Sequence, residues 1–153
     1  MPSPSTEAYT ASTPSWTVSR EPLSPVVRSH VRALVVSPRL EVRQPLIRTL
    51  ESLAMDVTAC ATCHDAEEVL ATRSIDLVFC DDRLPEGSYA DLIRAVGPRV
   101  IVVTRTGDWD LYLEALSKGA FDVIRCPWHP TDVELTVIRA LRESGPLAAS
   151  VAA

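Results

Sequence analysis

Residues 76–85 read DLVFCDDRLP, and this stretch decides how the rest of the chain is interpreted. The apolar run at residues 75–80 is rich in branched residues and short enough for a strand that is buried on both faces. Asp81, Asp82 and Arg83 follow it at once. Taken alone, the two carboxylates need no role beyond ending a strand in a polar loop, so their meaning depends on the neighbouring segments.

Four further apolar runs predict four more strands. They are RALVV (32–36), DVTAC (56–60), RVIVVT (99–104) and FDVIR (121–125). Helical periodicity lies between the runs, with a stripe of Val42, Leu46, Leu50 and Leu53 over residues 41–54, and similar patterns at 109–118 and 130–143. In the last pattern Leu135, Ile138 and Leu141 are expected to face inward.

Strands that alternate with helices predict a parallel sheet covered by helices on both faces. Right-handed crossovers leave few topologies for five strands. We therefore predict a flavodoxin-like, doubly wound α/β fold with strand order 2-1-3-4-5, in which chemistry sits at the carboxyl ends of the strands. The residues expected there are Ser37, Pro38, Asp81–Arg83, Thr104 and Cys126.

The composition of the chain limits the classes of protein to which it can belong. The chain has 153 residues, of which 46% are hydrophobic and 23% charged, as in one globular domain. The formal charge of −5 argues against a nucleic-acid partner. With no run of about 20 apolar residues and no signal peptide, we expect a cytoplasmic protein with reduced cysteines. Residues 1–30, rich in Pro, Ser and Thr, predict a disordered arm, residues 31–143 the domain and residues 144–153 a flexible tail.

Three motifs together resemble the receiver domain of two-component response regulators. DLVFCDDRLP is similar to that family's third strand, which ends in a phosphoacceptor aspartate, here Asp81, with a proline four residues later, here Pro85. VIVVTRTG is similar to the fourth strand, whose terminal Ser or Thr follows the phosphoryl group, here Thr104. KGAFDVIRCP resembles the fifth strand and its closing Lys-Pro. The resemblance covers about residues 31–143 and leaves Asp82 and Arg83 flanking the site.

This resemblance implies a signalling role rather than an enzyme. A sensor histidine kinase or phosphotransfer protein would donate a phosphoryl group to Asp81. Mg²⁺, held by Asp81 and an acidic pair after the first strand, together with a lysine after the fifth strand, would neutralise the charge of transfer. The family generally contacts its partners through the fourth helix, fifth strand and fifth helix, and the sequence leaves open whether the chain forms a homodimer.

The sequence departs from this pattern at the positions that bind cations. Ser37-Pro38 stands where the acidic pair belongs, Cys126 replaces the lysine, and Val123 replaces a switch aromatic. Asp81 alone would hold Mg²⁺ weakly. Asp82 should start on the opposite side of the strand from Asp81, and either its inward rotation or Arg83 as a resident cation would compensate. Two mechanisms stay open: phosphorylation of Asp81, with Thr104 as the switch, or a phosphorylation-independent pseudo-receiver that acts as an adaptor.

Cys60, Cys63 and His64 form a C-x-x-C-H pattern that is also typical of haem attachment. In register with the predicted fold, Thr62 is a helix N-cap and Asp65 completes a capping box, so these residues have structural roles. Three ligands are also fewer than structural zinc requires. A haem or metal protein is the distant alternative, and we expect neither haem nor zinc.

Trp109 and Trp128 stand near the starts of the last two predicted helices. Exposed, they would anchor a partner on the face that these helices form. The alternative is that the two tryptophans pack against neighbouring residues of the chain, and the sequence favours neither.

Overall fold

The computed structural model describes residues 31–152, with side chains described as far as residue 143. Its strands are β2 (Arg32–Val36), β3 (Asp56–Cys60), β4 (Leu77–Asp81), β5 (Val100–Thr104) and β6 (Asp122–Arg125). Its helices are α3 (Leu40–Ser52), α4 (Cys63–Thr72), α5 (Tyr89–Val96), α6 (Trp109–Ser117) and α7 (Pro130–Ala152). The predicted arm at residues 1–30 lies outside the described residues.

All five strands pair in parallel in the order β3-β2-β4-β5-β6, which confirms the predicted 2-1-3-4-5 topology. The register places Val36 of β2 opposite Cys60 on one side and Cys80 on the other. Because β2 and β4 are neighbours, the residues that follow β2 lie beside the end of β4. This adjacency brings residues 37–39 to Asp81.

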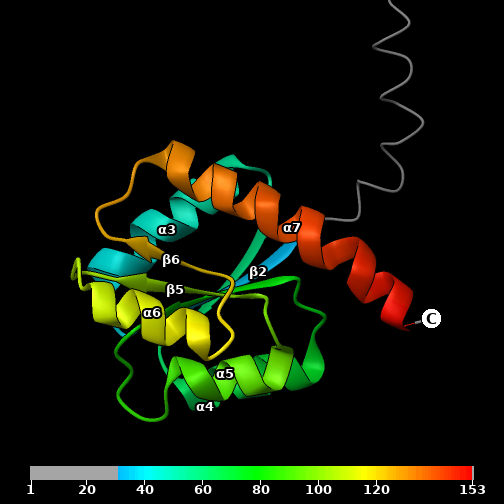
Figure 1. Ribbon diagram of the computed structural model, residues 1–153, viewed down its shortest axis with the longest axis horizontal. Coiled ribbons are helices and arrows are strands. Elements are labelled where there is room, and N and C mark those ends of the chain that lie inside the picture. Colours follow the sequence, from blue (N-terminus) through cyan, green and yellow to red (C-terminus); the bar gives the residue numbers. More distant parts are fainter. Residues whose placement is uncertain (1–30, 153) are drawn as a thin grey trace, which may run out of the picture. The chain divides into compact units, whose positions relative to one another are not determined.

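Two layers of helices cover the sheet (Figure 1). Helices α3 and α7 pack on one face, where Val42, Leu46 and Val137 meet Phe79 and other strand residues. Helices α4, α5 and α6 cover the other face. Since β4 and β5 are buried along their whole length, any charged group at their ends must be paired.

The inward face of α7 differs from the prediction. Leu135 and Ile138 were expected to face the core but are 53% and 41% exposed. The buried stripe is instead Val133, Thr136, Val137 and Ala140. Small and β-branched residues let the helix approach the sheet closely, so the larger side chains point outward.

Helix starts follow capping rules. In α4 the Thr62 side chain accepts a hydrogen bond from the Asp65 N–H at 3.1 Å, as predicted, but no return bond from Asp65 is present. Helix α5 was not singled out by its periodicity, yet Ser88 and Asp91 form a complete capping box at its start. Helix α7 begins at Pro130, where the predicted pattern begins, and continues to Ala152 beyond the predicted boundary at residue 143.

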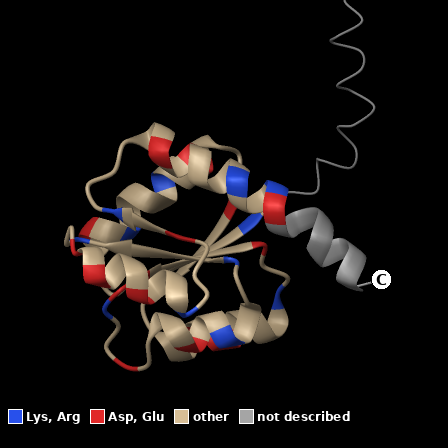
Figure 2. Cartoon of the chain, in the orientation of Figure 1, with Lys and Arg blue, Asp and Glu red and all other residues tan. Residues whose placement is uncertain are grey.

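Among the described residues, none of the helices combines the length and apolarity needed to cross a membrane. In the view of Figure 2, basic and acidic residues are interspersed over the helices.

Candidate functional site

Asp81, the last residue of β4, is the centre of a buried polar cluster at the carboxyl end of the sheet. Only 1% of the residue is exposed. Its Oδ2 accepts a hydrogen bond from the Ser37 hydroxyl at 2.7 Å, and its Oδ1 accepts one from the Arg83 backbone N–H at 3.0 Å. Ser37 is equally buried, because β2 ends beside β4.

Arg39 supplies the cation of this cluster. Its Nε donates to Asp81 Oδ2 at 3.0 Å and its Nη2 donates to Asp81 Oδ1. The same Nη2 also reaches Asp82 Oδ1 at 3.3 Å. A guanidinium that faces both oxygens of a carboxylate is the strongest pairing geometry available to side chains. One arginine therefore binds both acidic residues.

Asp82 turns into the cluster, which is one of the two compensations that the sequence left open, although it follows Asp81 directly. Its Oδ2 accepts a hydrogen bond from the Thr104 hydroxyl at 3.1 Å. Thr104, the last residue of β5, is 3% exposed, and its Oγ1 also accepts from the Thr106 N–H at 3.1 Å. A continuous chain of polar contacts thus links Ser37 and Arg39 after β2 to Thr104 at the end of β5.

Opposite electrostatic effects act on the two carboxyls. Burial raises the pKa of Asp81, but hydrogen bonds from Arg39, the Arg83 N–H and Ser37 outweigh it, so the pKa lies below its ordinary value. Burial and the neighbouring Asp81 raise the pKa of Asp82, and Thr104 and Arg39 offset only part of that rise. Asp81 is therefore the carboxylate that holds its negative charge more firmly.

The side chains present do not fit Mg²⁺. This ion requires near-octahedral oxygen ligands and usually one or two carboxylates. Here Pro38 offers no side-chain donor, both Asp81 oxygens face Arg39, and a guanidinium stands where a second cation would be repelled. Within the described residues, no group of three His, Cys, Asp or Glu side chains is placed to hold a metal ion.

The remaining predicted positions lie around this cluster. Cys126 is half-buried and packs on the α3/α7 side of the core, and its backbone N–H donates to the Thr104 carbonyl at 2.7 Å. Pro85 and Arg83 are exposed, and Arg83 contributes its backbone rather than its guanidinium. The resident cation is therefore Arg39 and not Arg83.

The Cys60-Cys63-His64 segment forms the turn from β3 into α4. The Cys60 thiol lies 3.8 Å from the Thr62 carbonyl, the Cys63 thiol lies 3.9 Å from Glu67, and His64 lies 3.3 Å from Glu68. The three side chains contact different partners. Burial raises the pKa of each of the two thiols to about 11.

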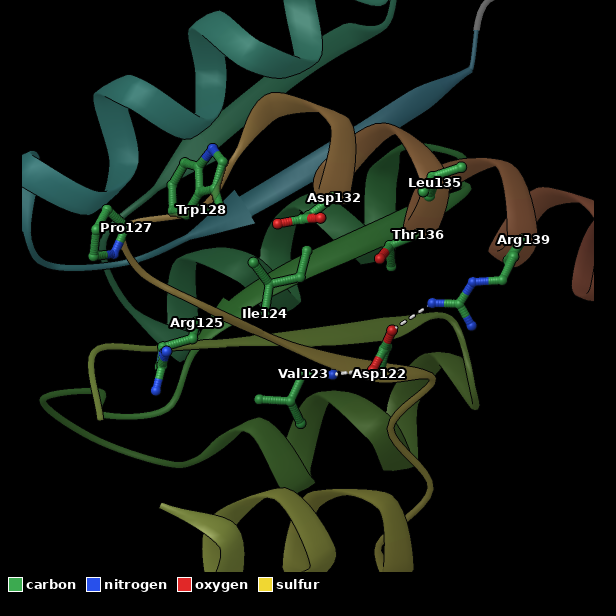
Figure 3. A pocket seen from close by; sticks show the side chains of 10 residues that line it. All are labelled: Asp122, Val123, Ile124, Arg125, Pro127, Trp128, Asp132, Leu135, Thr136 and Arg139. Carbon is green, nitrogen blue, oxygen red and sulfur yellow. Dashed lines mark hydrogen bonds and ion pairs between the residues drawn. The ribbon is translucent and has the colours of Figure 1, made fainter. Parts of the chain in front are cut away.

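The two tryptophans have different environments. Trp109 is 65% exposed and stacks on Tyr112 with ring centroids 5.1 Å apart. Trp128 packs against the core on the α3/α7 face, and its Nε1 donates to Thr49 Oγ1 at 3.4 Å. Trp128 also lines a hollow of about 430 Å³ between β6 and α7, and Leu135 and the ion pair of Asp122 with Arg139 line it too (Figure 3).

Sequence reasoning missed Arg39, although one signal was available. The residue follows Ser37-Pro38 directly, at the end of the strand that neighbours β4 in the predicted order. A long cationic side chain at that place can reach Asp81 across the strand ends.

Comparisons with known proteins agree with the fold. Residues 33–138 match the family model of the response regulator receiver domain. Response regulator protein PilR of Pseudomonas aeruginosa is 33% identical over 123 residues, covering 77% of this chain and 28% of PilR. Regulatory protein LuxO of Vibrio cholerae is 30% identical over 103 residues, covering 64% of this chain and 23% of LuxO. The chain thus spans less than a third of these relatives.

Solved structures share the architecture. A response regulator receiver domain protein from Clostridium thermocellum superposes with a TM-score of 0.68 at 24% identity, over 76% of this chain and 98% of that one. The signal receiver domain of a putative LuxO repressor from Vibrio parahaemolyticus gives a TM-score of 0.70 at 21% identity, over 79% and 97%. These likenesses establish the fold.

Proposed function

The chain belongs to the response regulator receiver domain family of two-component signalling, and from this premise we propose that it signals through protein–protein contacts without Mg²⁺-assisted phosphorylation of Asp81. The observation that carries this proposal is the engagement of both Asp81 oxygens by Arg39. The domain is then an adaptor whose contact surface is present without a phosphoryl group.

The chemistry of phosphoryl transfer supports this reading. A carboxylate attacks phosphorus with a lone pair, and the approach of two anions needs positioned cations. Here the Asp81 lone pairs accept hydrogen bonds from Arg39, Ser37 and the Arg83 N–H. Attack would require Arg39 or Ser37 to leave, so the barrier rises by part of the energy of that pairing.

A second candidate is a slow phosphoacceptor at Asp81. It is favoured by Thr104, whose hydroxyl lies within the same cluster, and by the Arg39 guanidinium, which can neutralise a phosphoryl oxygen. The phosphoryl donor would then be a sensor histidine kinase or a phosphotransfer protein, as for other members of the family.

Intact-mass spectrometry separates the two candidates. The full chain and an Asp81→Asn control are incubated for hours with acetyl phosphate, with and without MgCl₂. We expect no phosphoryl adduct on either protein. An adduct on the wild type that is absent from Asp81→Asn would overturn the adaptor function and establish the phosphoacceptor.

The proposed contact face lies on α6, β6 and α7. Among the described residues, Trp109 and Leu113 of α6 and Leu135 and Ile138 of α7 account for four of the five large hydrophobic side chains that are exposed. The hollow between β6 and α7 adds a concave surface beside Leu135 (Figure 3). Helices α6 and α7 both contact the edge strand β6, and exposed apolar side chains that flank one edge of a sheet are typical of protein-binding surfaces.

Sedimentation velocity tests the simplest occupant of this face, a second copy of the chain. A concentration-dependent dimer that Leu135→Asp and Ile138→Asp abolish, without loss of helical circular dichroism, would identify the face as self-associating. A monomer at all concentrations would direct the search to a different protein, which we propose to be cytoplasmic like the chain itself.

A further inference from the structure

Hydrogen bonds from both its backbone and its side chain fix the position of Arg39. It is the residue directly before α3, in an extended conformation with φ −97° and ψ 117°. Its backbone N–H donates to Ser37 Oγ at 3.1 Å, and that hydroxyl in turn lies 2.7 Å from Asp81 Oδ2. The backbone and the guanidinium of Arg39 are therefore fixed to the same carboxylate.

The neighbouring Arg43 holds the loop from the other side. Its Nη1 donates to the Ser37 carbonyl at 2.7 Å, so the turn after β2 is bound at both its side chain and its backbone. The Arg39 side chain is 25% exposed, while the Asp81 side chain is fully buried. The Arg39 side chain is therefore the more exposed partner of this ion pair, and it covers both oxygens of the buried carboxylate.

The two acidic residues of the site share one cation. Asp81 and Asp82 are adjacent carboxylates that would repel each other, and Arg39 contacts both. The Ser37 and Thr104 hydroxyls and the Arg83 N–H supply further donors to these two carboxyls. Two acids and one cation leave one formal negative charge, and the neutral donors direct their hydrogen bonds at the carboxylates that carry it.

We propose that Arg39 is an intramolecular substitute for the divalent cation of this fold, which makes the acidic site of this receiver independent of metal ions. The inference rests on the proposed function, since it concerns the same carboxylate, and it deepens that function by naming what holds the site in one state. Arginine suits the role because its rigid fork matches a carboxylate and its charge cannot be titrated in proteins.

A Mg²⁺ titration of the full chain tests this assignment. Unfolding is measured in EDTA and in 10 mM MgCl₂ at constant ionic strength for the wild type and for the double variant Ser37→Asp/Arg39→Ala. The wild type should show no response to MgCl₂. The double variant removes the guanidinium and adds a carboxylate beside Asp81. If the vacated site binds Mg²⁺ with a dissociation constant of about 1 mM, 10 mM MgCl₂ should raise the folding equilibrium constant of the variant roughly tenfold.

The matched control is Ser37→Asp/Arg105→Ala, which adds the same carboxylate but removes an exposed arginine and keeps Arg39. It should show no response to MgCl₂. Saturable stabilisation of the wild type by millimolar Mg²⁺ would overturn the proposal, as would a folded Ser37→Asp/Arg39→Ala variant that ignores MgCl₂. The wild-type titration decides the question even when the double variant does not fold.

These outcomes are distinct from those of the phosphorylation experiment. A wild type that forms an adduct without needing MgCl₂ would overturn the proposed function and leave the role of Arg39 standing. A wild type that binds Mg²⁺ yet forms no adduct would overturn the role of Arg39 and leave the proposed function standing.

Discussion

Replacement of Arg39 by methionine should destabilise the domain by about 3 kcal/mol at pH 7.5. Methionine keeps much of the side-chain stem and removes the guanidinium, so the change isolates the ionic contact. The variant leaves Asp81 buried and keeps the hydrogen bonds from the Ser37 hydroxyl and the Arg83 N–H. A buried carboxylate without a counter-ion is costly because its hydration has been lost.

The magnitude follows from the geometry. Breaking a buried ion pair by removing one partner costs about 3–5 kcal/mol. The lower end applies here because two neutral donors remain and because the Arg39 side chain is 25% exposed, so that it retains part of its hydration. Urea unfolding followed by circular dichroism measures the difference.

The cost should depend on pH. In the wild type the pKa of Asp81 lies below its ordinary value, so the stability it contributes is present above the unfolded pKa of about 3.9 and is lost as the pH falls through the folded value. In Arg39→Met, burial is no longer outweighed and the pKa of Asp81 rises above the ordinary value. Asp82, which faces the same guanidinium, shifts in the same direction. The variant therefore gains stability relative to the wild type as the pH falls, and the difference should shrink to about 1 kcal/mol near pH 4.

Arg105→Met is the matched control. Arg105 pairs with Glu41 at 2.7 Å, but the two side chains are 48% and 60% exposed, and such surface pairs contribute about 0–1 kcal/mol. A cost for Arg39→Met within about 1 kcal/mol of this control, or one that is equal at both pH values, would refute the role assigned to Arg39.

Three further predictions concern other parts of the structure. Thr104→Val removes the donor to Asp82 and should raise the pKa of that carboxyl further, as measured by carboxyl NMR titration, with a loss of about 1 kcal/mol in stability. Ser88→Ala removes the capping box of α5 and should cost about 1 kcal/mol in urea unfolding. Cys60 and Cys63, whose pKa values are raised from 9.0 to about 11, should be alkylated about a hundredfold more slowly at pH 7.5 in the folded chain than in urea, as followed by peptide mass spectrometry.

Each of these three predictions has a result that would contradict it. A pKa of Asp82 that is unchanged in Thr104→Val would mean that the hydroxyl points elsewhere. A Ser88→Ala variant as stable as the wild type would show that the cap is satisfied by water. Equal alkylation rates in folded and unfolded chains would place the two thiols in solvent.

The sheet was predictable because strands buried on both faces must be apolar along their whole length. Each of the five runs became a strand, with ends shifted by at most two residues, as in Leu77–Asp81 for the run at 75–80. Positions at the strand ends, such as Asp81 and Thr104, followed from the topology. Helix α5, which is eight residues long, was not predicted, although Leu92 and Ile93 form part of a buried face on it.

The centre of the site was less predictable, because a sequence pattern locates backbone positions rather than the ends of long side chains. Arg83 is nearer to Asp81 in sequence, but its side chain is exposed, whereas Arg39 lies 42 residues away and supplies the guanidinium. Helix α7 illustrates a related limit. Its sequence carries two apolar stripes, one through Leu135 and Ile138 and one through Val133 and Val137, and only packing against the sheet selects between them.

The covalent attachment of the site's cation has a consequence for control. The occupancy of a metal site depends on its surroundings, because it rises with the concentration of the free ion and falls when a chelator competes for that ion. A guanidinium carried on the chain is present at a fixed effective concentration set by the backbone, which no dilution, chelator or ionic change in the cell can lower. In this domain the chain itself supplies the guanidinium that contacts Asp81, and unfolding, protonation of the carboxylates at low pH, or a partner that moves the loop after β2 would release it.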